Sequence, residues 1–232
     1  MPSTPSSASG NPEGSRGSSP CALPSPSTRR RYSLCRLARA FKSRRAMKTT
    51  VPVVQGAAKA LRFFDHIAPW YDRINARIYK RRWLERVRSE IHGLRVLDVG
   101  VGTGFTTGHL TASVGIDLSR EMLKRARYRG HLVRADVMQP PFRPGSFDTI
   151  VFAGSFYYLP SPEAGATMTA DLLRLGGRAI ILSPATKLLA LFVRVYRPEE
   201  YRQFMGGAGL RLLRFERLNW AACLVIAERP RS

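Results

Sequence analysis

The chain has 232 residues, of which 44% are hydrophobic, and its 38 basic and 16 acidic residues give it a net charge of +22. This length and apolar fraction fit one globular domain with extensions. Three cysteines without a Cys-x-x-Cys pair exclude a disulfide framework and a cysteine metal site, and no apolar run approaches the ~20 residues of a membrane-spanning helix.

The positive charge is spread over the whole chain. Ten of the basic residues and one acid lie in residues 1–50, which leaves a net charge of +13 for residues 51–232. A basic protein fits nucleic acid or an anionic membrane surface as its partner. The simpler interpretation, which we favour, is a set of solvated helix faces preceded by a basic tail.

Residues 1–50 are rich in Ser, Pro and Gly and then in Arg, with almost nothing to bury. This composition predicts a disordered tail. A Ser- and Arg-rich leader with few acids resembles an organelle transit peptide. An over-extended start, with Met47 as the true first residue, is favoured slightly, because the arginines never form a clear amphipathic helix.

Residues 51–93 are predicted to form capping helices over 57–67 and from 70 to about 91, the second of them heavily basic. In the second helix, apolar residues recur at the three-to-four spacing of one helix face. This stripe consists of Tyr71, Ile74, Ile78, Leu84 and Val87.

Beyond Gly93, short apolar runs alternate with helical stretches, which indicates a parallel sheet with helices on both faces. The last two runs are only three residues apart, too few for a crossover, so we expect an antiparallel hairpin at the edge. Residues 94–228 are therefore predicted to form an α/β, doubly wound, Rossmann-like domain with a mostly parallel seven-stranded sheet. Strands are expected at 95–99, 113–117, 131–134, 147–153, 177–183, 210–217 and 221–227, and helices near 104–111, 119–128, 162–174 and 198–208.

The first of these strands ends in three glycines at alternate positions, Gly100, Gly102 and Gly104. Glycines at a strand-to-helix turn allow unusual backbone angles and let a ligand approach the main chain closely. The next strand ends in Asp117, 17 residues after Gly100, and a carboxylate there can accept hydrogen bonds from a ribose diol. Together these residues predict a pocket for a nucleoside.

The run Asp98-Val-Gly-Val-Gly-Thr-Gly104 resembles motif I of the class I S-adenosylmethionine-dependent methyltransferases, and the resemblance covers residues 57–228. It implies S-adenosylmethionine as the cofactor. In such folds the glycine loop meets the amino-acid part of the cofactor, the second strand's acid holds the ribose, and the third strand's acid meets the adenine. Carried over, the cofactor-binding residues are Tyr71 over the methionine end, Asp98 as loop orienter or water-mediated ammonium contact, Gly100, Gly102, Thr103, Gly104, Asp117, Leu118, Asp136 and Val137.

A catalytic base is not evident in the sequence. A nucleophile held in line with an activated methyl group can react by proximity, whereas a carbon or nitrogen acceptor also has to lose a proton. The histidines are candidates by residue type only; they are His66, His92, His109 and His131.

The methyl acceptor is less clearly indicated. Residues 64–75 resemble the N-terminal helix of the ubiquinone/menaquinone-biosynthesis C-methyltransferases, but these enzymes have an Arg-Asn pair where this chain has Gly154-Ser-Phe-Tyr-Tyr-Leu159. That departure argues against a quinone acceptor. Phe156, Tyr157 and Tyr158 are expected to form an aromatic acceptor wall instead, with core packing as the alternative.

Residues 187–197 are apolar with cationic ends. This pattern is typical of a lid over a greasy substrate or of a membrane-surface helix. The ordinary alternative, which we favour, is a buried connecting helix.

The leading hypothesis is an enzyme that transfers a methyl group from S-adenosylmethionine to a small hydrophobic or aromatic acceptor. Its expected location is cytoplasmic, with membrane-peripheral association as an option for a lipophilic acceptor. Two other classes stay open: RNA methylation or RNA binding, from the Arg-rich helix at 73–88, and a non-catalytic cofactor-binding protein, because a fold does not guarantee chemistry.

Overall fold

The computed structural model describes residues 57–190 and 192–231. The predicted tail at 1–50 lies outside the described residues. The strands are β1 (Val96–Val99), β2 (Ser113–Asp117), β3 (His131–Arg134), β4 (Phe147–Ala153), β5 (Leu173–Pro184), β6 (Arg211–Arg217) and β7 (Ala222–Glu228). The helices are α2 (Ala57–Ile67), α3 (Tyr71–Ile78), α4 (Arg81–Ser89), α5 (Arg120–Arg125), α6 (Pro162–Leu172) and α7 (Pro198–Gly207), with 3-10 turns η1 (Ala68–Trp70), η2 (Phe156–Tyr158) and η3 (Lys187–Leu189).

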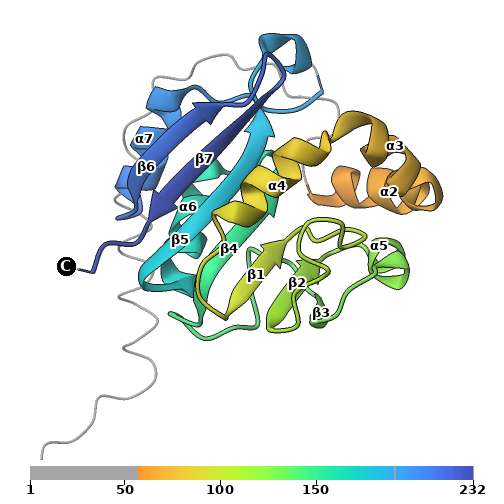
Figure 1. Cartoon of the computed structure of the whole chain (residues 1–232), viewed down its shortest axis with the longest axis horizontal. Helices are drawn as coiled ribbons and strands as arrows, with labels where there is room; N and C mark the ends of the chain where they lie inside the picture. The colour runs from red at the N-terminus through yellow and green to blue at the C-terminus, as the bar shows by residue number, and fades with distance from the viewer. Residues whose placement is uncertain (1–56, 191, 232) are drawn as a thin grey trace, which may run out of the picture. The chain divides into compact units, whose positions relative to one another are not determined.

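The strands form one sheet in the order β3-β2-β1-β4-β5-β7-β6 (Figure 1). Strands β1 to β5 pair in parallel, whereas β7 pairs antiparallel with both β5 and β6. The predicted mostly parallel seven-stranded sheet and its C-terminal antiparallel hairpin are confirmed. Strand β5 begins four residues earlier than predicted, with a register shift against β4.

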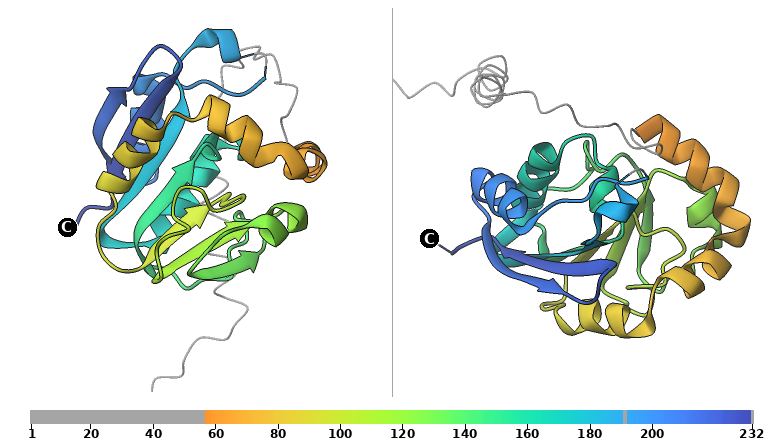
Figure 2. Two further views of the ribbon diagram at one scale, coloured as in Figure 1. Left: turned by 45° about the vertical axis from the view of Figure 1, so that its right-hand side comes forward. Right: turned by 90° about the horizontal axis from the view of Figure 1, so that it is seen from above.

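Side chains of the central strands alternate between two hydrophobic clusters, because successive residues of a strand point to opposite faces. In β4, Ile150 and Phe152 belong to the cluster that α6 and α7 cover, while Val151 belongs to the cluster that contains Trp83 and Val87 of α4. Figures 1 and 2 show α4 on one face of the sheet and α6 with α7 on the other. The doubly wound architecture is thus confirmed around β4, β5 and β7.

The helix predicted at 104–111 is wrong. These residues form successive turns, with Gly104 at a positive φ of 83°. Only eight residues separate Gly104 from β2, and they include three threonines and a glycine, which are poor helix formers. The chain has to return from the end of β1 to the start of β2 within this length, so turns replace a helix.

The helix predicted over 70–91 is two helices. Tyr79 and Lys80 are extended, and they separate α3 from α4. The predicted apolar stripe therefore does not form one face: Val87 is fully buried, whereas Ile78 is 56% exposed. The break turns α4 onto the sheet and leaves residues 57–78, here called the cap, at the carboxyl ends of the parallel strands beside α5 (Figures 1 and 2).

Candidate functional site

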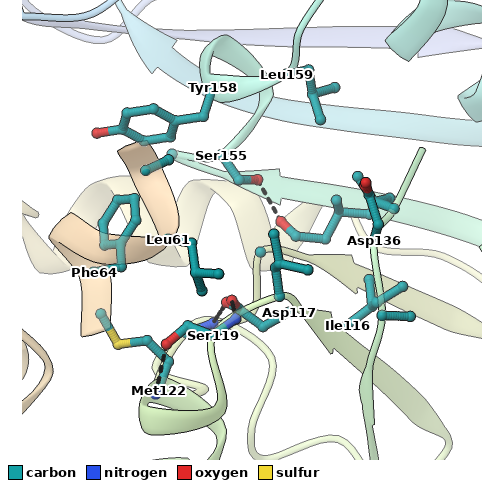
Figure 3. Close-up of a pocket in the computed structure, with 18 of the residues that line it drawn as sticks. Leu61, Phe64, Ile116, Asp117, Ser119, Met122, Asp136, Ser155, Tyr158 and Leu159 are labelled. Atoms are coloured by element: carbon teal, nitrogen blue, oxygen red, sulfur yellow. Dashed lines mark hydrogen bonds between the residues drawn. The ribbon is translucent and has the colours of Figure 1, made fainter. Parts of the chain in front are cut away.

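A pocket of about 170 Å³ opens at the carboxyl ends of the parallel strands. Its walls include Gly100 after β1 and Gly154 after β4, the two strands between which the order of the sheet reverses. Open α/β sheets bind ligands at such a switch point. Figure 3 shows the lining side chains, with Leu61 and Phe64 of α2 facing Asp117, Ser119 and Asp136.

The glycine turn after β1 brings backbone amides to the pocket floor. Gly100 and Gly102 have φ values of 67° and 55°, which favour glycine. A Cβ on Gly100 would lie 2.6 Å from the Ser155 Cβ, and one on Gly102 would lie 3.4 Å from the Tyr71 ring. A side chain at either position would therefore occupy the space beside Ser155 or Tyr71 at the pocket.

Asp117 ends β2 and stands in the pocket wall. Its carboxylate accepts hydrogen bonds from the backbone N–H of Gly102 (2.9 Å) and of Ser119 (2.9 Å). Burial raises the pKa of Asp117 above its usual value, while those N–H groups oppose the shift. The carboxylate is thereby fixed between the two loops that any nucleoside in the pocket would contact.

Asp98 lies beneath the glycine turn and not in the pocket wall. Its Oδ2 accepts a 2.6 Å hydrogen bond from Thr107, and among the described residues its buried Oδ1 has no partner. Burial raises the pKa of Asp98 to about 7. This position fits the expected role of orienting the loop.

The third sequence-predicted acid, Asp136, follows β3 and lines the pocket together with Val137. Its carboxylate accepts a hydrogen bond from the backbone N–H of Met138 at 2.9 Å. Asp136 and Val137 thus line the same cavity as Asp117, and Figure 3 shows both acids across from Phe64.

An aromatic wall closes the pocket on the side of the cap. The Phe64 ring meets the rings of Tyr71 and Tyr158 edge to face, with centroids 6.0 and 5.2 Å apart. Burial raises the pKa of Tyr71, and it raises the pKa of Tyr158 to about 12. Both hydroxyls therefore stay protonated near neutral pH and can donate hydrogen bonds.

The cap is tied to the two loops that flank the pocket. Asp65 of α2 accepts a 2.5 Å hydrogen bond from the Ser119 hydroxyl, and Asp72 of α3 accepts one of 2.6 Å from the Thr103 hydroxyl. Thr103 itself does not line the pocket. Its role in this structure is to hold the cap over the glycine turn.

The structure brings most of the expected residues into one cavity. The lining residues among them are Tyr71, Gly100, Gly102, Asp117, Leu118, Asp136, Val137 and Tyr158. Asp98, Thr103 and Gly104 lie next to the cavity without lining it. Phe156 and Tyr157 differ from the expected acceptor wall: Phe156 is fully buried against Phe152 and Phe204 on the α7 side of the sheet, and Tyr157 packs behind Tyr158.

Sequence reasoning did not predict several other lining residues, among them Leu61, Ser119, Met122 and Ser155. Ser119 and Met122 follow Asp117 by two and five residues, and Ser119 caps α5 by accepting from the Met122 N–H. Proximity to Asp117 could have indicated both. Leu61 carries no such signal, because an apolar residue of a capping helix is compatible with ordinary core packing.

Residues 187–197 do not form the buried connecting helix that we favoured. They begin with η3, and Leu188 and Phe192 are exposed. Arg194 donates a hydrogen bond to the carbonyl of Pro160, a pocket-lining residue.

Within the described ranges, no helix is long and apolar enough to cross a membrane.

Residues 97–181 match the family model of a methyltransferase domain. The matched region contains the glycine turn, Asp117, Asp136 and β4, the elements that build the pocket. This match, together with the sheet order and the pocket, identifies a class I S-adenosylmethionine-dependent methyltransferase domain in the chain. Its cofactor is S-adenosylmethionine.

Related proteins support this family at the level of sequence and fold. The chain is 28% identical to a rice chloroplastic 2-methyl-6-phytyl-1,4-hydroquinone methyltransferase, over 72% of this chain and 57% of the relative. It is 29% identical to the ubiquinone/menaquinone biosynthesis C-methyltransferase of Geotalea uraniireducens, over 60% of this chain and 68% of that protein. The chain thus spans little more than half the length of the plant relatives.

Solved structures share the fold of this methyltransferase. A possible histamine N-methyltransferase from Thermotoga maritima superimposes with a TM-score of 0.63 at 19% identity, covering 73% of this chain and 99% of that one. The geranyl diphosphate C-methyltransferase of Streptomyces coelicolor gives a TM-score of 0.56 at 13% identity, covering 64% and 77%. At these identities the likeness shows the fold alone.

The residues of the pocket fit S-adenosylmethionine. Gly100 and Gly102 carry no side chain that would keep a ligand from the main chain, and the Asp117 carboxylate in the pocket wall can accept hydrogen bonds from a ribose diol. The unpartnered Oδ1 of Asp98 below the turn suits a nearby ammonium group, because a buried carboxylate oxygen without a partner is costly.

Proposed function

We propose that this methyltransferase modifies a small aromatic acceptor of the phenol or hydroquinone class that carries an apolar substituent. The observation that carries this proposal is the aromatic wall of Phe64, Tyr71 and Tyr158 beside the glycine turn. The rice relative is named for a phytyl hydroquinone and the Geotalea relative for C-methylation in ubiquinone and menaquinone biosynthesis, which supports the same class. The absence of the Arg-Asn pair argues against a quinone held as in those relatives, and in this proposal Tyr71 and Tyr158 hold the acceptor oxygen instead.

In this proposal the two tyrosines position the acceptor. S-adenosylmethionine supplies an activated methyl carbon when it is bound. Phe64 packs against the acceptor ring, and the protonated hydroxyls of Tyr71 and Tyr158 donate hydrogen bonds to its oxygen. The raised pKa values of both tyrosines make them poor bases. The proton that the acceptor loses on methylation then passes to solvent water, and catalysis relies on alignment of the acceptor rather than on a strong general base.

The cofactor half of this proposal is tested by calorimetry with S-adenosylmethionine. Asp117→Ala should weaken binding at least tenfold, because it removes the acceptor aimed at the ribose. Asp171→Ala is the matched control, since Asp171 is an exposed acid at the end of α6, away from the pocket. Equal affinities of the two variants for S-adenosylmethionine would show that Asp117 does not contribute to its binding.

The acceptor half is tested by transfer of a labelled methyl group to 2-methyl-6-phytyl-1,4-hydroquinone, to a demethylmenaquinol and to a polar phenol without an apolar tail. Labelling of the lipophilic pair and not of the polar phenol is expected. Tyr158→Phe should lower turnover with little effect on cofactor affinity. Cofactor binding without labelled product from any of them, or from a native extract, would instead identify a non-catalytic cofactor-binding protein.

A further inference from the structure

The cap is a helical segment with two different faces. Its inner face contributes Leu61, Phe64 and Tyr71 to the pocket. Its outer face presents Phe63, 42% exposed, and Trp70, 51% exposed. Large aromatic side chains are expensive to leave in water, so this exposure requires an explanation that the pocket does not provide.

Charges on the cap are separated in the same way. Both of its acids, Asp65 and Asp72, hydrogen-bond the loops around the cofactor site. Its cations Lys59, Arg62, Arg73 and Arg77 are all exposed. Within the described part of the chain, none of these cations takes part in an ion pair, unlike Arg86 of α4 and Arg214 of β6. The outer face is therefore aromatic and cationic.

The order of these residues is regular. Exposed residues recur along the cap at steps of four and three, which is the spacing of one side of a helical segment. They are Lys59, Phe63, His66, Trp70, Arg73 and Arg77. The rings of His66 and Trp70 lie 6.2 Å apart across the junction of α2 and η1, so the side continues through the kink.

A second apolar segment borders the same edge of the sheet. Leu188 and Phe192, 76% and 57% exposed, follow the cation Lys187. Figures 1 and 2 show η3 and the cap both at the carboxyl ends of the parallel strands, the edge that holds the pocket. Aliphatic and aromatic groups mixed with cations thus flank the pocket from two elements.

We propose that the outer face of the cap docks onto an anionic lipid surface. Basic residues near such a surface are attracted to its lipid headgroups, and exposed aromatic and aliphatic side chains enter the headgroup boundary. A polyanion such as RNA would use the arginines, but it offers nothing to Leu188 or Ile78. The pocket then lies beside the bilayer that stores a lipophilic acceptor, a consequence that rests on the proposed function.

Vesicle partitioning of the full chain tests the docking face. The probes are vesicles of phosphatidylglycerol with phosphatidylcholine and vesicles of phosphatidylcholine alone, without acceptor or cofactor. Arg73→Gln with Arg77→Gln should lower the partition coefficient on anionic vesicles about 25-fold, roughly fivefold per cation removed. Phe63→Ala with Trp70→Ala should lower it at least tenfold, and this loss should persist when added salt screens the charges.

Two matched controls keep the test specific. The charge control, Arg129→Gln with Arg143→Gln, removes the same charge at exposed residues that precede β3 and β4. The apolar control, Leu94→Ala with Leu175→Ala, removes exposed apolar side chains near the starts of β1 and β5. Both controls lie at the amino ends of strands and should change partitioning less than twofold. An equal loss in controls and cap variants would overturn the proposal.

Fluorescence quenching by brominated lipids gives an independent readout. In a Trp220→Phe chain the remaining tryptophans are Trp70 and the buried Trp83, so quenching on anionic vesicles reports Trp70. Absence of quenching would contradict a lipid-docking face. A single-stranded RNA that binds more tightly than the vesicles, and whose binding the same cap variants weaken, would also contradict it. Because no methyl transfer is measured, failure of the docking face and failure of the proposed enzyme activity are distinguishable.

Discussion

Asp98 stands out among the individual residues because a carboxyl group is buried with one of its oxygens unpartnered among the described residues. Burial raises its pKa from 3.8 in the unfolded chain to about 7. Between these two values the folded chain holds a proton that the unfolded chain has released. The contribution of Asp98 to stability is therefore complete in acid and is lost as the pH rises through about 7.

This reasoning predicts that the cofactor-free protein loses about 3 kcal/mol of unfolding free energy between pH 5 and pH 8 through Asp98. Asp98→Asn cannot ionise and should flatten that part of the profile. Urea unfolding at the two pH values, for the wild type and the variant, measures the difference. A wild type and a variant with parallel pH profiles would show that Asp98 is not responsible.

Gly154 is a residue-scale constraint on the same site. It has a φ of 90°, and a Cβ there would lie 1.8 Å from the Tyr79 hydroxyl oxygen. Gly154→Ala should cost about 2–4 kcal/mol through strain and overpacking. Gly145→Ala is the matched control, since its φ is 70° but nothing lies within 4 Å, and it should cost about 1 kcal/mol.

Tyr79→Phe removes the colliding oxygen and should restore part of the loss when it is combined with Gly154→Ala. The difference from the sum of the single variants measures this coupling. Additive losses in chemical denaturation would mean that the hydroxyl is not the group that excludes a side chain at Gly154.

At the scale of the elements, the strands could be predicted because apolar β-branched runs such as 147–153 are bounded by polar and glycine residues. The turns at 104–111 could not be predicted. Their position between two strands favoured a helix, whereas the short connection to β2 excludes one. The pocket acids Asp117 and Asp136 could be predicted because each follows the end of a strand. The side of the sheet to which Phe156 points depends on η2, which no periodicity in the sequence reveals.

The cap depends on two hydrogen bonds at its inner face. Asp65→Ala with Asp72→Ala removes the partners of Ser119 and Thr103, and each bond to a charged group contributes about 1.5–3 kcal/mol. We expect S-adenosylmethionine to dissociate at least tenfold faster and amide hydrogens of the cap to exchange faster. Glu85→Ala, an exposed acid on α4 that pairs only with Arg81 among the described residues, should change neither rate.

Helix α4 is attached to the hairpin by a shared ion network. Arg86 contacts Glu90 at 2.5 Å and Glu216 at 2.9 Å, and Arg214 contacts Glu90 as well. Arg86→Ala should cost about 1–2 kcal/mol because Glu90 is mostly buried. Arg81→Ala breaks only an exposed pair and should cost less than about 0.5 kcal/mol in urea unfolding.

At the scale of the whole molecule, net charge was a weak guide to function. The excess of +13 in residues 51–232 includes arginines paired between α4 and β6 as well as the unpaired cations of the cap. Composition alone cannot separate these groups, because the distinction depends on which acids the fold brings close. The location of the charge on one face, and not its sum, favours a lipid surface as partner.

The connection between β1 and β2 links ligand binding to the stability of the fold. Val101 of the glycine turn packs onto Gly115 of β2, and Arg88 of α4 donates to the carbonyls of Phe105 and Thr106. The turn that lines the pocket thus also packs against β2, next to the edge strand β3. Binding of S-adenosylmethionine to the folded chain should therefore raise its melting temperature as the cofactor concentration rises, so that the stability of the fold reports the supply of methyl donor.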